Sequence, residues 1–452
     1  MIRRLAIALL AVLLTTPALV APAVAAAPDV THYTGALPDG ATWVADVPEP
    51  WNGTLVLFSH GFGALIPIDA PDPGVQQALL DRGYALVGSS YDPNGSIWAL
   101  ESATRDQFAS LAAITDRIGE PRLTLALGSS MGGLVSGQEA QTSGTRLDGA
   151  VSICGLMAGG IDLNNYQLDG EYAINRLLRP SQPVKLVDYV SPDEGAAAAA
   201  ELSTTATQAR TTAPGRARLA LATALLTMPT WSAGQTQPPA AGDAEGIAAA
   251  QYDWLVTTLP FIMPGRYFIE LSAGGNASWN TGVDYAGLLA RSPYRHTVDA
   301  LYRAAGLDLR ADLSDLTRHA AIRPDYAAVA SLTRTSTLSG HLDVPQLTMH
   351  TIYDQLAPVE HENQYARQVV AAGDAALLRQ AYVTRRGHCA FATSEIIAAL
   401  RAVSHRAVTG RWDAAATTQR LQAAAIALGM GDAPAFVDFR PGPFVSHRRP
   451  PR

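Results

Sequence analysis

The stretch of sequence that decides the fold is Leu123-Thr124-Leu125-Ala126-Leu127-Gly128-Ser129-Ser130-Met131-Gly132-Gly133. Its first five residues form an apolar run typical of a buried strand, and the segment after it is apolar enough to begin a helix. Between strand and helix stands the pattern G-x-S-x-G. Side chains at its two glycines would collide with neighbouring backbone, so the pattern predicts a strained turn with Ser130 at its tip.

Ser130 is the candidate nucleophile of this turn. Ser129 is not, because Leu127 and not a glycine stands two residues before it. The same pattern also arises by chance in tight turns rich in glycine and serine, so the assignment depends on its surroundings. A serine hydroxyl reacts at neutral pH only when a base accepts its proton, and that base needs an acid to hold it.

Strand-like and helix-like segments alternate on both sides of the turn. Their strands lack polar alternation, as expected for a parallel sheet covered by helices on both faces. Strands are predicted at 54–59, 84–89, 123–127, 150–154, 346–353 and 378–383, and helices at 75–81 and 105–118. The sequence therefore predicts the α/β class, with a mostly parallel, doubly wound sheet.

The segment between the two groups of strands has a different character. Breaks rich in Pro and Gly separate Ala-rich helical stretches at 196–202 and 217–226, and 252–271 carries too much apolar surface for a disordered linker. We interpret this segment as a large helical cap inserted into the core. The predicted division is a signal peptide 1–25, core 26–154, cap 155–341, core 342–405, and a C-terminal helix and tail 406–452.

The N-terminus has the charged, apolar and small-residue order of a secretory signal peptide, with cleavage expected after Ala25. The alternative is an uncleaved membrane anchor, for which the apolar run is short. We therefore expect a secreted protein with no stable membrane insertion after cleavage. Its two cysteines, Cys154 and Cys389, would then meet an oxidising compartment, where a single disulfide is the default.

The formal net charge is −7, and the arginines are scattered except in the last residues. No basic face recommends a nucleic acid as partner. His447 to Arg452 is expected to be a solvated tail. The histidines are spread too widely to suggest a zinc site, so neither a metal nor a cofactor is expected. The oligomeric state stays open.

Two residues downstream of Ser130 qualify as its partners. Asp354 follows the predicted strand 346–353 and is the candidate acid, with Glu360 as the alternative. His388 follows the last predicted core strand and is the candidate base. The other histidines have simpler explanations: His350 stands in mid-strand, His361 on a helix face, and His319 and His405 on helix surfaces.

Upstream, the first predicted core strand ends in Ser59-His60-Gly61-Phe62-Gly63. With this His-Gly loop, the serine turn, and the order Ser, Asp, His, the chain resembles the α/β-hydrolase superfamily over about 47–154 and 342–403. The resemblance implies an oxyanion hole made by the backbone N–H groups of Phe62, or less readily Gly63, and of Met131. His60 itself is expected to be a structural hydrogen-bonding residue.

The resemblance also places the two cysteines. Cys389 follows the candidate base, and Cys154 ends a strand near the same edge of the sheet. The His-Cys pair is similar to that of secreted tannases and feruloyl esterases, whose second cysteine stands beside the nucleophile, where this chain has Ser129. A Cys154–Cys389 bridge would clamp the loop of His388; a free Cys389 thiol is the competing interpretation.

The resemblance implies a serine esterase that cleaves carboxylic esters, small or polymeric, through an acyl-enzyme. The apolar stretch 254–268 favours apolar acyl or alcohol groups over a charged peptide terminus. A serine peptidase of the aminopeptidase type and an acyltransferase are the enzymatic alternatives. A secreted binding protein that has lost catalysis on this scaffold is the non-enzymatic one.

Overall fold

A computed structural model describes residues 28–448 of the 452-residue chain. The predicted signal peptide, residues 1–25, lies outside the described residues. The described chain forms one nine-stranded sheet in the order β1-β2-β4-β3-β5-β6-β7-β8-β9. The strands are β1 Asp29–Ala36, β2 Thr42–Glu49, β3 Thr54–Ser59, β4 Ala85–Ser89, β5 Leu123–Ser129, β6 Gly149–Ile153, β7 Gln346–Tyr353, β8 Leu378–Arg386 and β9 Phe436–Val437.

The strands from β4 to β8 in this order are all parallel, and antiparallel strands close both edges. Every residue of β3, β4 and β6 is buried, as expected for parallel strands covered on both faces. The predicted mostly parallel sheet is confirmed. Strands β1 and β2 were not predicted, because β1 is largely exposed and gives no apolar run.

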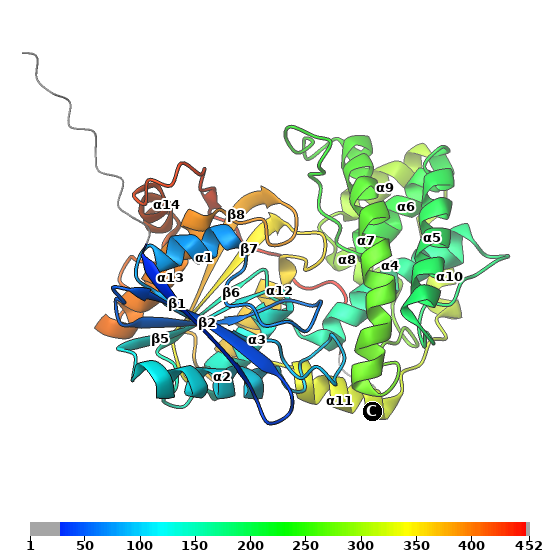
Figure 1. Ribbon diagram of the computed structural model, residues 1–452. Coiled ribbons are helices and arrows are strands. Elements are labelled where there is room, and N and C mark those ends of the chain that lie inside the picture. Colours follow the sequence, from blue (N-terminus) through cyan, green and yellow to red (C-terminus); the bar gives the residue numbers. More distant parts are fainter. Residues whose placement is uncertain (1–27, 449–452) are drawn as a thin grey trace, which may run out of the picture.

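Two layers of helices cover the sheet (Figure 1). Helices α1 Pro73–Leu80, α13 Thr393–Thr409 and α14 Thr418–Ile426 pack with one face of the sheet, and α2 Ala103–Ile118, α3 Met131–Thr142 and α12 Glu360–Ala372 pack with the other. Alternate residues of β3 divide between the two apolar cores: Val56 faces the first layer, and Leu55 and Leu57 face the second. The core is therefore a doubly wound α/β structure.

The chain between β6 and β7 is helical and forms a body of its own beside the sheet, drawn in green to yellow in Figure 1. Its helices are α4 Gly160–Leu178, α5 Pro192–Ala209, α6 Ala213–Leu225, α7 Ala244–Ala273, α8 Tyr285–Arg291, α9 Arg295–Ala304, α10 Leu309–His319 and α11 Tyr326–Ser336. Local sequence explains where two of them begin: Ser191 and Thr212 accept hydrogen bonds from the first turns of α5 and α6. We refer to this body as the cap.

Helix α4 runs through the middle of the cap and is buried along almost its whole length. Its Glu171 forms an ion pair of 3.0 Å with Arg266 of α7, and both side chains are fully enclosed. The guanidinium also donates a hydrogen bond of 2.7 Å to the hydroxyl of Ser278. The cap thus has a polar core that fixes α7 relative to α4.

The C-terminal segment, residues 441–448, runs from the core to the cap. Its Arg448 and Ser446 each donate a hydrogen bond of 2.7 Å to Asp169 of α4, and His447 lies 2.7 Å from Asp162. Of the two described residues of the predicted solvated tail, 447–452, Arg448 has a largely buried side chain, so the prediction is wrong there, whereas His447 is exposed but bonded to Asp162. They are held because α4 presents buried carboxylates that need partners.

Candidate active site

The predicted serine turn joins β5 to α3. Ser130 has φ 59° and ψ −123°, a conformation that residues with side chains rarely adopt. A Cβ atom on Gly128 would lie 1.9 Å from the carbonyl oxygen of Gly132, and one on Gly132 would lie 1.9 Å from that of Ser59. Both glycines are therefore required by sterics, as the G-x-S-x-G pattern indicates.

Ser130, His388 and Asp354 come together at the carboxyl ends of β5, β8 and β7. The Nε2 atom of His388 lies 2.8 Å from the Oγ of Ser130, and its Nδ1 lies 2.7 Å from Oδ2 of Asp354. The other carboxylate oxygen of Asp354 accepts hydrogen bonds from the backbone N–H groups of Leu356 and Ala357, at 2.8 and 2.9 Å. This geometry allows His388 to accept the serine proton while Asp354 fixes its tautomer.

A second histidine lies behind Asp354. His350 of β7 is fully buried, and its Nε2 lies 2.8 Å from the carbonyl oxygen of Ala357 and 3.5 Å from Oδ2 of Asp354. Its Nδ1 lies 3.2 Å from the carboxylate of Glu362 on α12. No sequence motif signals this contact, because it joins the interior of a strand to a helix that packs against it.

Asp354 and Glu362 raise the pKa of the buried His350 ring, and the ring in turn lowers the pKa of Asp354. Burial disfavours a charged imidazole, but Asp354 and Glu362 outweigh it and raise the pKa of His350 to about 10. Burial alone would raise the pKa of Asp354, yet His388 and His350 hold it well below its ordinary value. Asp354 is therefore an ionised carboxylate at neutral pH.

Two neighbours of the triad do not join it. Glu360, the alternative acid, begins α12, and burial raises its pKa to about 7. The Nδ1 of His388 is bonded to Asp354 instead. His361 lies on a face of α12, as predicted, and that face is buried; its Nδ1 accepts a hydrogen bond of 2.9 Å from the N–H of Ala158, and burial lowers its pKa to about 3.

A disulfide joins Cys154 to Cys389, which are 235 positions apart in sequence and have their Cα atoms 5.2 Å apart. Cys154 follows β6, and Cys389 follows His388 directly. The hydroxyl of Thr351 also bonds the carbonyl of Gly387, at 2.9 Å. The loop that carries His388 is thus held on both sides of the ring, and the competing free thiol at Cys389 is excluded.

The His-Gly loop lies against the serine. A Cβ on Gly61 would come within 3.1 Å of the Cβ of Ser130. Neither the N–H of Phe62 nor that of Met131 donates a hydrogen bond to any described residue. These are the two amides that the sequence assigns to an oxyanion hole, and both are free to donate.

His60 holds the loop in place. Its ring stacks on Tyr91 with centroids 4.1 Å apart, and its Nδ1 donates a hydrogen bond of 2.9 Å to the carbonyl of Gly61. Burial lowers the pKa of His60, which keeps the ring neutral. These contacts agree with the structural role expected of this residue.

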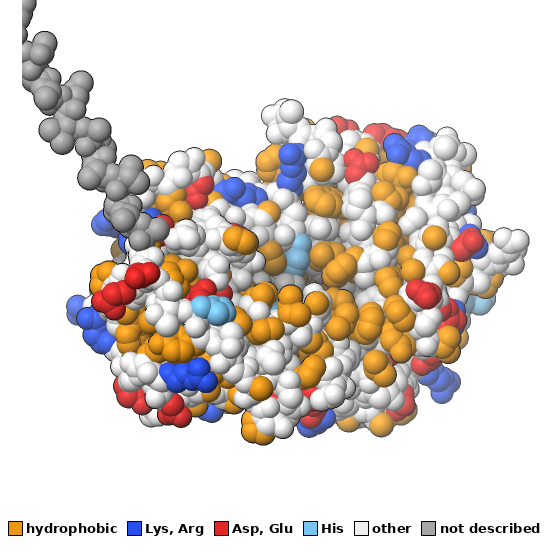
Figure 2. Space-filling view, viewed as in Figure 1, with side chains coloured by type: hydrophobic (Ala, Val, Ile, Leu, Met, Phe, Trp, Pro, Cys, Tyr) orange, Lys and Arg blue, Asp and Glu red, His pale blue; other side chains and the backbone are white. Residues whose placement is uncertain are grey.

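A narrow apolar cavity opens at Ser130, between the core and the cap. Its walls are Phe62, Trp98, Ser130, Leu156, Leu163, Gln167, Phe261, Ile262, Gly265, Ile269, Leu356 and His388. The space open to the centre of a water-sized sphere is about 50 Å³, several times the roughly 10–15 Å³ that one water needs. Figure 2 shows hydrophobic side chains gathered along this junction of core and cap, around a hollow.

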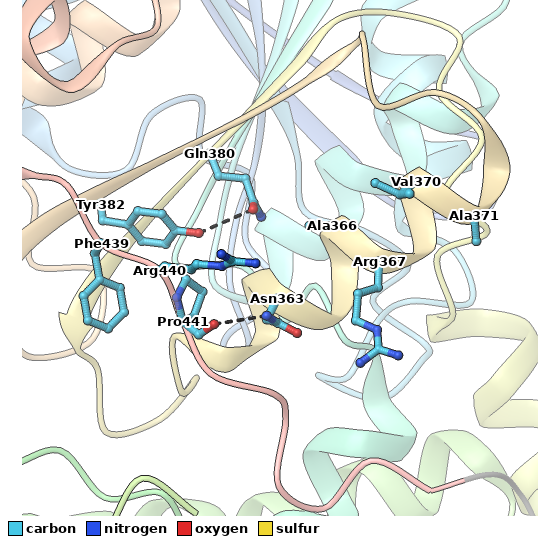
Figure 3. A pocket seen from close by; sticks show the side chains of 10 residues that line it. All are labelled: Asn363, Ala366, Arg367, Val370, Ala371, Gln380, Tyr382, Phe439, Arg440 and Pro441. Carbon is cyan, nitrogen blue, oxygen red and sulfur yellow. Dashed lines mark hydrogen bonds between the residues drawn. The ribbon is translucent and has the colours of Figure 1, made fainter. Parts of the chain in front are cut away.

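A wider hollow lies away from these residues, between α12, β8 and the chain that follows β9 (Figure 3). It measures about 590 Å³ and is open to solvent. Figure 3 shows Asn363 bonded to the carbonyl of Pro441 and Tyr382 bonded to Gln380 within it. Because it contains no residue of the serine site, it is not the candidate active site.

The sheet, the strained serine between strand and helix, and the chain order Ser130, Asp354, His388 are those of the α/β-hydrolase fold. They define the chain as a protein of this fold. Within residues 28–448, none of the helices has the length and apolar character needed to cross a membrane.

Comparisons with known proteins find similarity to proteins of more than one activity. No family model matches the chain. It is 28% identical over 408 residues to an o-phthalyl amidase of Xanthobacter agilis, which covers 84% of this chain and 88% of that protein. An esterase from Aspergillus oryzae has 15% identity and a TM-score of 0.45, over 84% of this chain and 80% of that one. Feruloyl esterase B from the same organism has 13% identity and a TM-score of 0.40, over the same shares.

Proposed function

We propose that the chain is a secreted serine hydrolase that cleaves carboxylic esters with an apolar acyl group, through an acyl-enzyme on Ser130. The observation that carries the proposal is the continuous hydrogen-bonded chain from Ser130 to His388 to Asp354 at the mouth of an apolar cavity. The disulfide and the signal-like N-terminus support secretion, because disulfides persist in oxidising compartments.

The reaction follows from the geometry. Ser130 attacks the ester carbonyl while Nε2 of His388 takes its proton, and Asp354 stabilises the imidazolium that forms. The N–H groups of Phe62 and Met131 bind the oxyanion of the tetrahedral intermediate, each contributing about 3–4 kcal/mol. His388 then protonates the leaving alcohol, and water releases the acyl group by the same steps.

The cavity supports an apolar acyl group. Among the described residues that line it, there is no Lys, Arg, Asp or Glu to pair with a charged substrate. Aromatic rings surround Phe62 on the cap side, with Phe261 at 5.9 Å and Phe268 at 6.1 Å between centroids. An acyl chain or ring buried there would gain about 25 cal/mol for each Å² removed from water.

Amide hydrolysis is the second candidate, because the relative at 28% identity is an amidase. The same nucleophile, base and oxyanion donors serve both bonds, and only the leaving group differs. The esterase and amidase proposals therefore share the acyl-enzyme and differ only in the step that forms it, in which an alcohol or an amine leaves.

The test compares a p-nitrophenyl ester with the p-nitroanilide that has the same acyl group, using the purified mature protein. Turnover of the ester with at least a hundredfold slower turnover of the anilide is the expected result; equal turnover would favour the amidase. Ser130→Ala should abolish both activities, and Ser129→Ala is the matched control that keeps them. Turnover retained in Ser130→Ala would contradict the proposal.

A further inference from the structure

His350 faces hydrogen-bond acceptors with both of its ring nitrogens. Nε2 points at the carbonyl oxygen of Ala357, at 2.8 Å, and Nδ1 at the carboxylate of Glu362, at 3.2 Å. A carbonyl oxygen and a carboxylate can only accept, so each nitrogen must carry a proton to bond its partner. A neutral imidazole has one such proton, whereas an imidazolium has two.

The carboxylate of Glu362 is surrounded by hydrogen-bond donors. The carboxylate accepts hydrogen bonds from the hydroxyl of Thr348 and from the amide of Gln380, the latter at 2.6 Å. With His350 it has three donors and lies fully inside the protein. A buried charge is stable only when it is paired and hydrogen-bonded, and the carboxylates of Asp354 and Glu362 provide such partners for an imidazolium at His350.

We propose that His350 is a buried imidazolium that positions Asp354, so that Glu362 and His350 form a second pair behind the Ser130–His388–Asp354 chain. This inference rests on the proposed function, because positioning matters only if the triad works. His350 does not line the substrate cavity. It is a positioning residue that acts through Asp354.

The position of His350 gives it two effects on Asp354. Its Nε2 lies 3.5 Å from Oδ2, the oxygen that bonds His388, and so opposes protonation of the carboxylate. It also bonds the carbonyl of Ala357, whose N–H bonds Oδ1 of Asp354. The turn from 354 to 357 is therefore tied to the ring, and with it the direction of the carboxylate.

The charged and titratable groups that face His350 come from three elements. They are Asp354 at the end of its own strand, Glu360, His361 and Glu362 on α12, His388 after β8, and Tyr382, which stands opposite His350 on β8. The direct contacts are the two carboxylates. They outweigh the cost of burial and raise the pKa of His350 to about 10, and His361 stays neutral because its own pKa is lowered to about 3.

The first experiment measures kcat and KM against pH for the wild-type protein and for His350→Gln, with a p-nitrophenyl ester. Removing the cation makes the imidazolium of the base easier to form, so the acid limb of kcat/KM should move up by about one pH unit. kcat at neutral pH should fall while KM stays nearly constant, since His350 does not touch the cavity. His405, a half-buried histidine on α13 that is not part of the serine site, provides the matched control, and His405→Gln should leave the profile unchanged.

The second experiment reads the protonation state in the wild-type protein and does not depend on the variant folding. With ¹⁵N-labelled histidine, His350 should show two protonated ring nitrogens at pH 8.5, where exposed histidines are neutral. A neutral His350 at that pH, or a pH profile of His350→Gln that superimposes on the wild type, would overturn the inference. If the wild type hydrolysed no ester, the proposed function would fail, whereas the NMR spectrum would still show independently whether His350 is charged.

Discussion

Removing the disulfide between Cys154 and Cys389 should lower the stability of the protein. Cys154 and Cys389 are 235 positions apart, and the loop that the bridge closes contains the whole cap. The chain-entropy relation gives a stabilisation of about 5 kcal/mol for a loop of this length, of which natural bridges commonly deliver about 2–4 kcal/mol. We therefore expect Cys154→Ala/Cys389→Ala to lower the free energy of unfolding by about 2–5 kcal/mol. Alanine suits Cys154, which is completely buried among apolar side chains.

The same double variant should lose part of its activity while folded. Gly387 keeps two hydrogen bonds in the absence of the bridge, from its N–H to Tyr353 and from Thr351 to its carbonyl. The loop of His388 is then held on one side only, so we expect kcat to fall on the order of tenfold, less than the roughly 10²-fold of a full 1 Å misplacement.

Urea unfolding followed by tryptophan fluorescence, in parallel with ester turnover, tests both effects. Wild-type protein treated with a reductant should approach the double variant, and the double variant should not respond to the reductant. An unfolding midpoint equal to that of the untreated wild type would refute the reasoning.

Three further changes test other parts of the structure. Arg448→Ala leaves the buried carboxylate of Asp169 with neutral donors and should lower the free energy of unfolding by about 2–4 kcal/mol. The control Arg440→Ala, at an exposed arginine, should change it by less than about 0.5 kcal/mol. Equal effects in thermal unfolding would contradict the role of the C-terminal segment. Because the pKa of His350 is raised to about 10, its contribution to stability should be complete below about pH 6.5 and be lost as the pH rises toward 10; urea midpoints that stay level over this range in wild type would exclude a charged ring. Among the described residues that line the cavity, Gln167 is the only one with a side-chain amide. Gln167→Met should therefore change kcat/KM of p-nitrophenyl benzoate little but lower that of an isosteric pyridinecarboxylate by about two- to tenfold. An unchanged ratio of the two esters would show that the amide does not contact the acyl group.

The candidate triad could be predicted because its residues follow strands. Ser130 has a local motif with a steric cause, and Asp354 and His388 each stand just after a buried apolar run. Parallel strands bring their carboxyl ends to one edge, so three short patterns far apart in sequence become one site. The same reasoning located the disulfide, since Cys154 and Cys389 also stand at strand ends.

The residues behind the triad, the buried carboxylates of the cap and the edge strand could not be predicted from the sequence, because they depend on how separate elements pack together. His350 and Glu362 lie on a strand and a helix whose relative placement no local pattern specifies. Helix α4 carries Asp162 and Asp169 and has the composition of a surface helix, yet the cap and the C-terminal segment bury both carboxylates. Strand β1 escaped notice because an exposed edge strand needs no apolar face.

The central claim is that Ser130 is the nucleophile of this site. A fluorophosphonate reacts only with a serine that an adjacent base activates, and mass spectrometry of the digested protein identifies the modified residue. Ser130 is expected to carry the label in the wild type, the Ser130→Ala variant is expected to carry none, and ester turnover should fall in proportion to labelling. A label on any other serine, or full ester turnover in protein whose Ser130 is completely labelled, would contradict it.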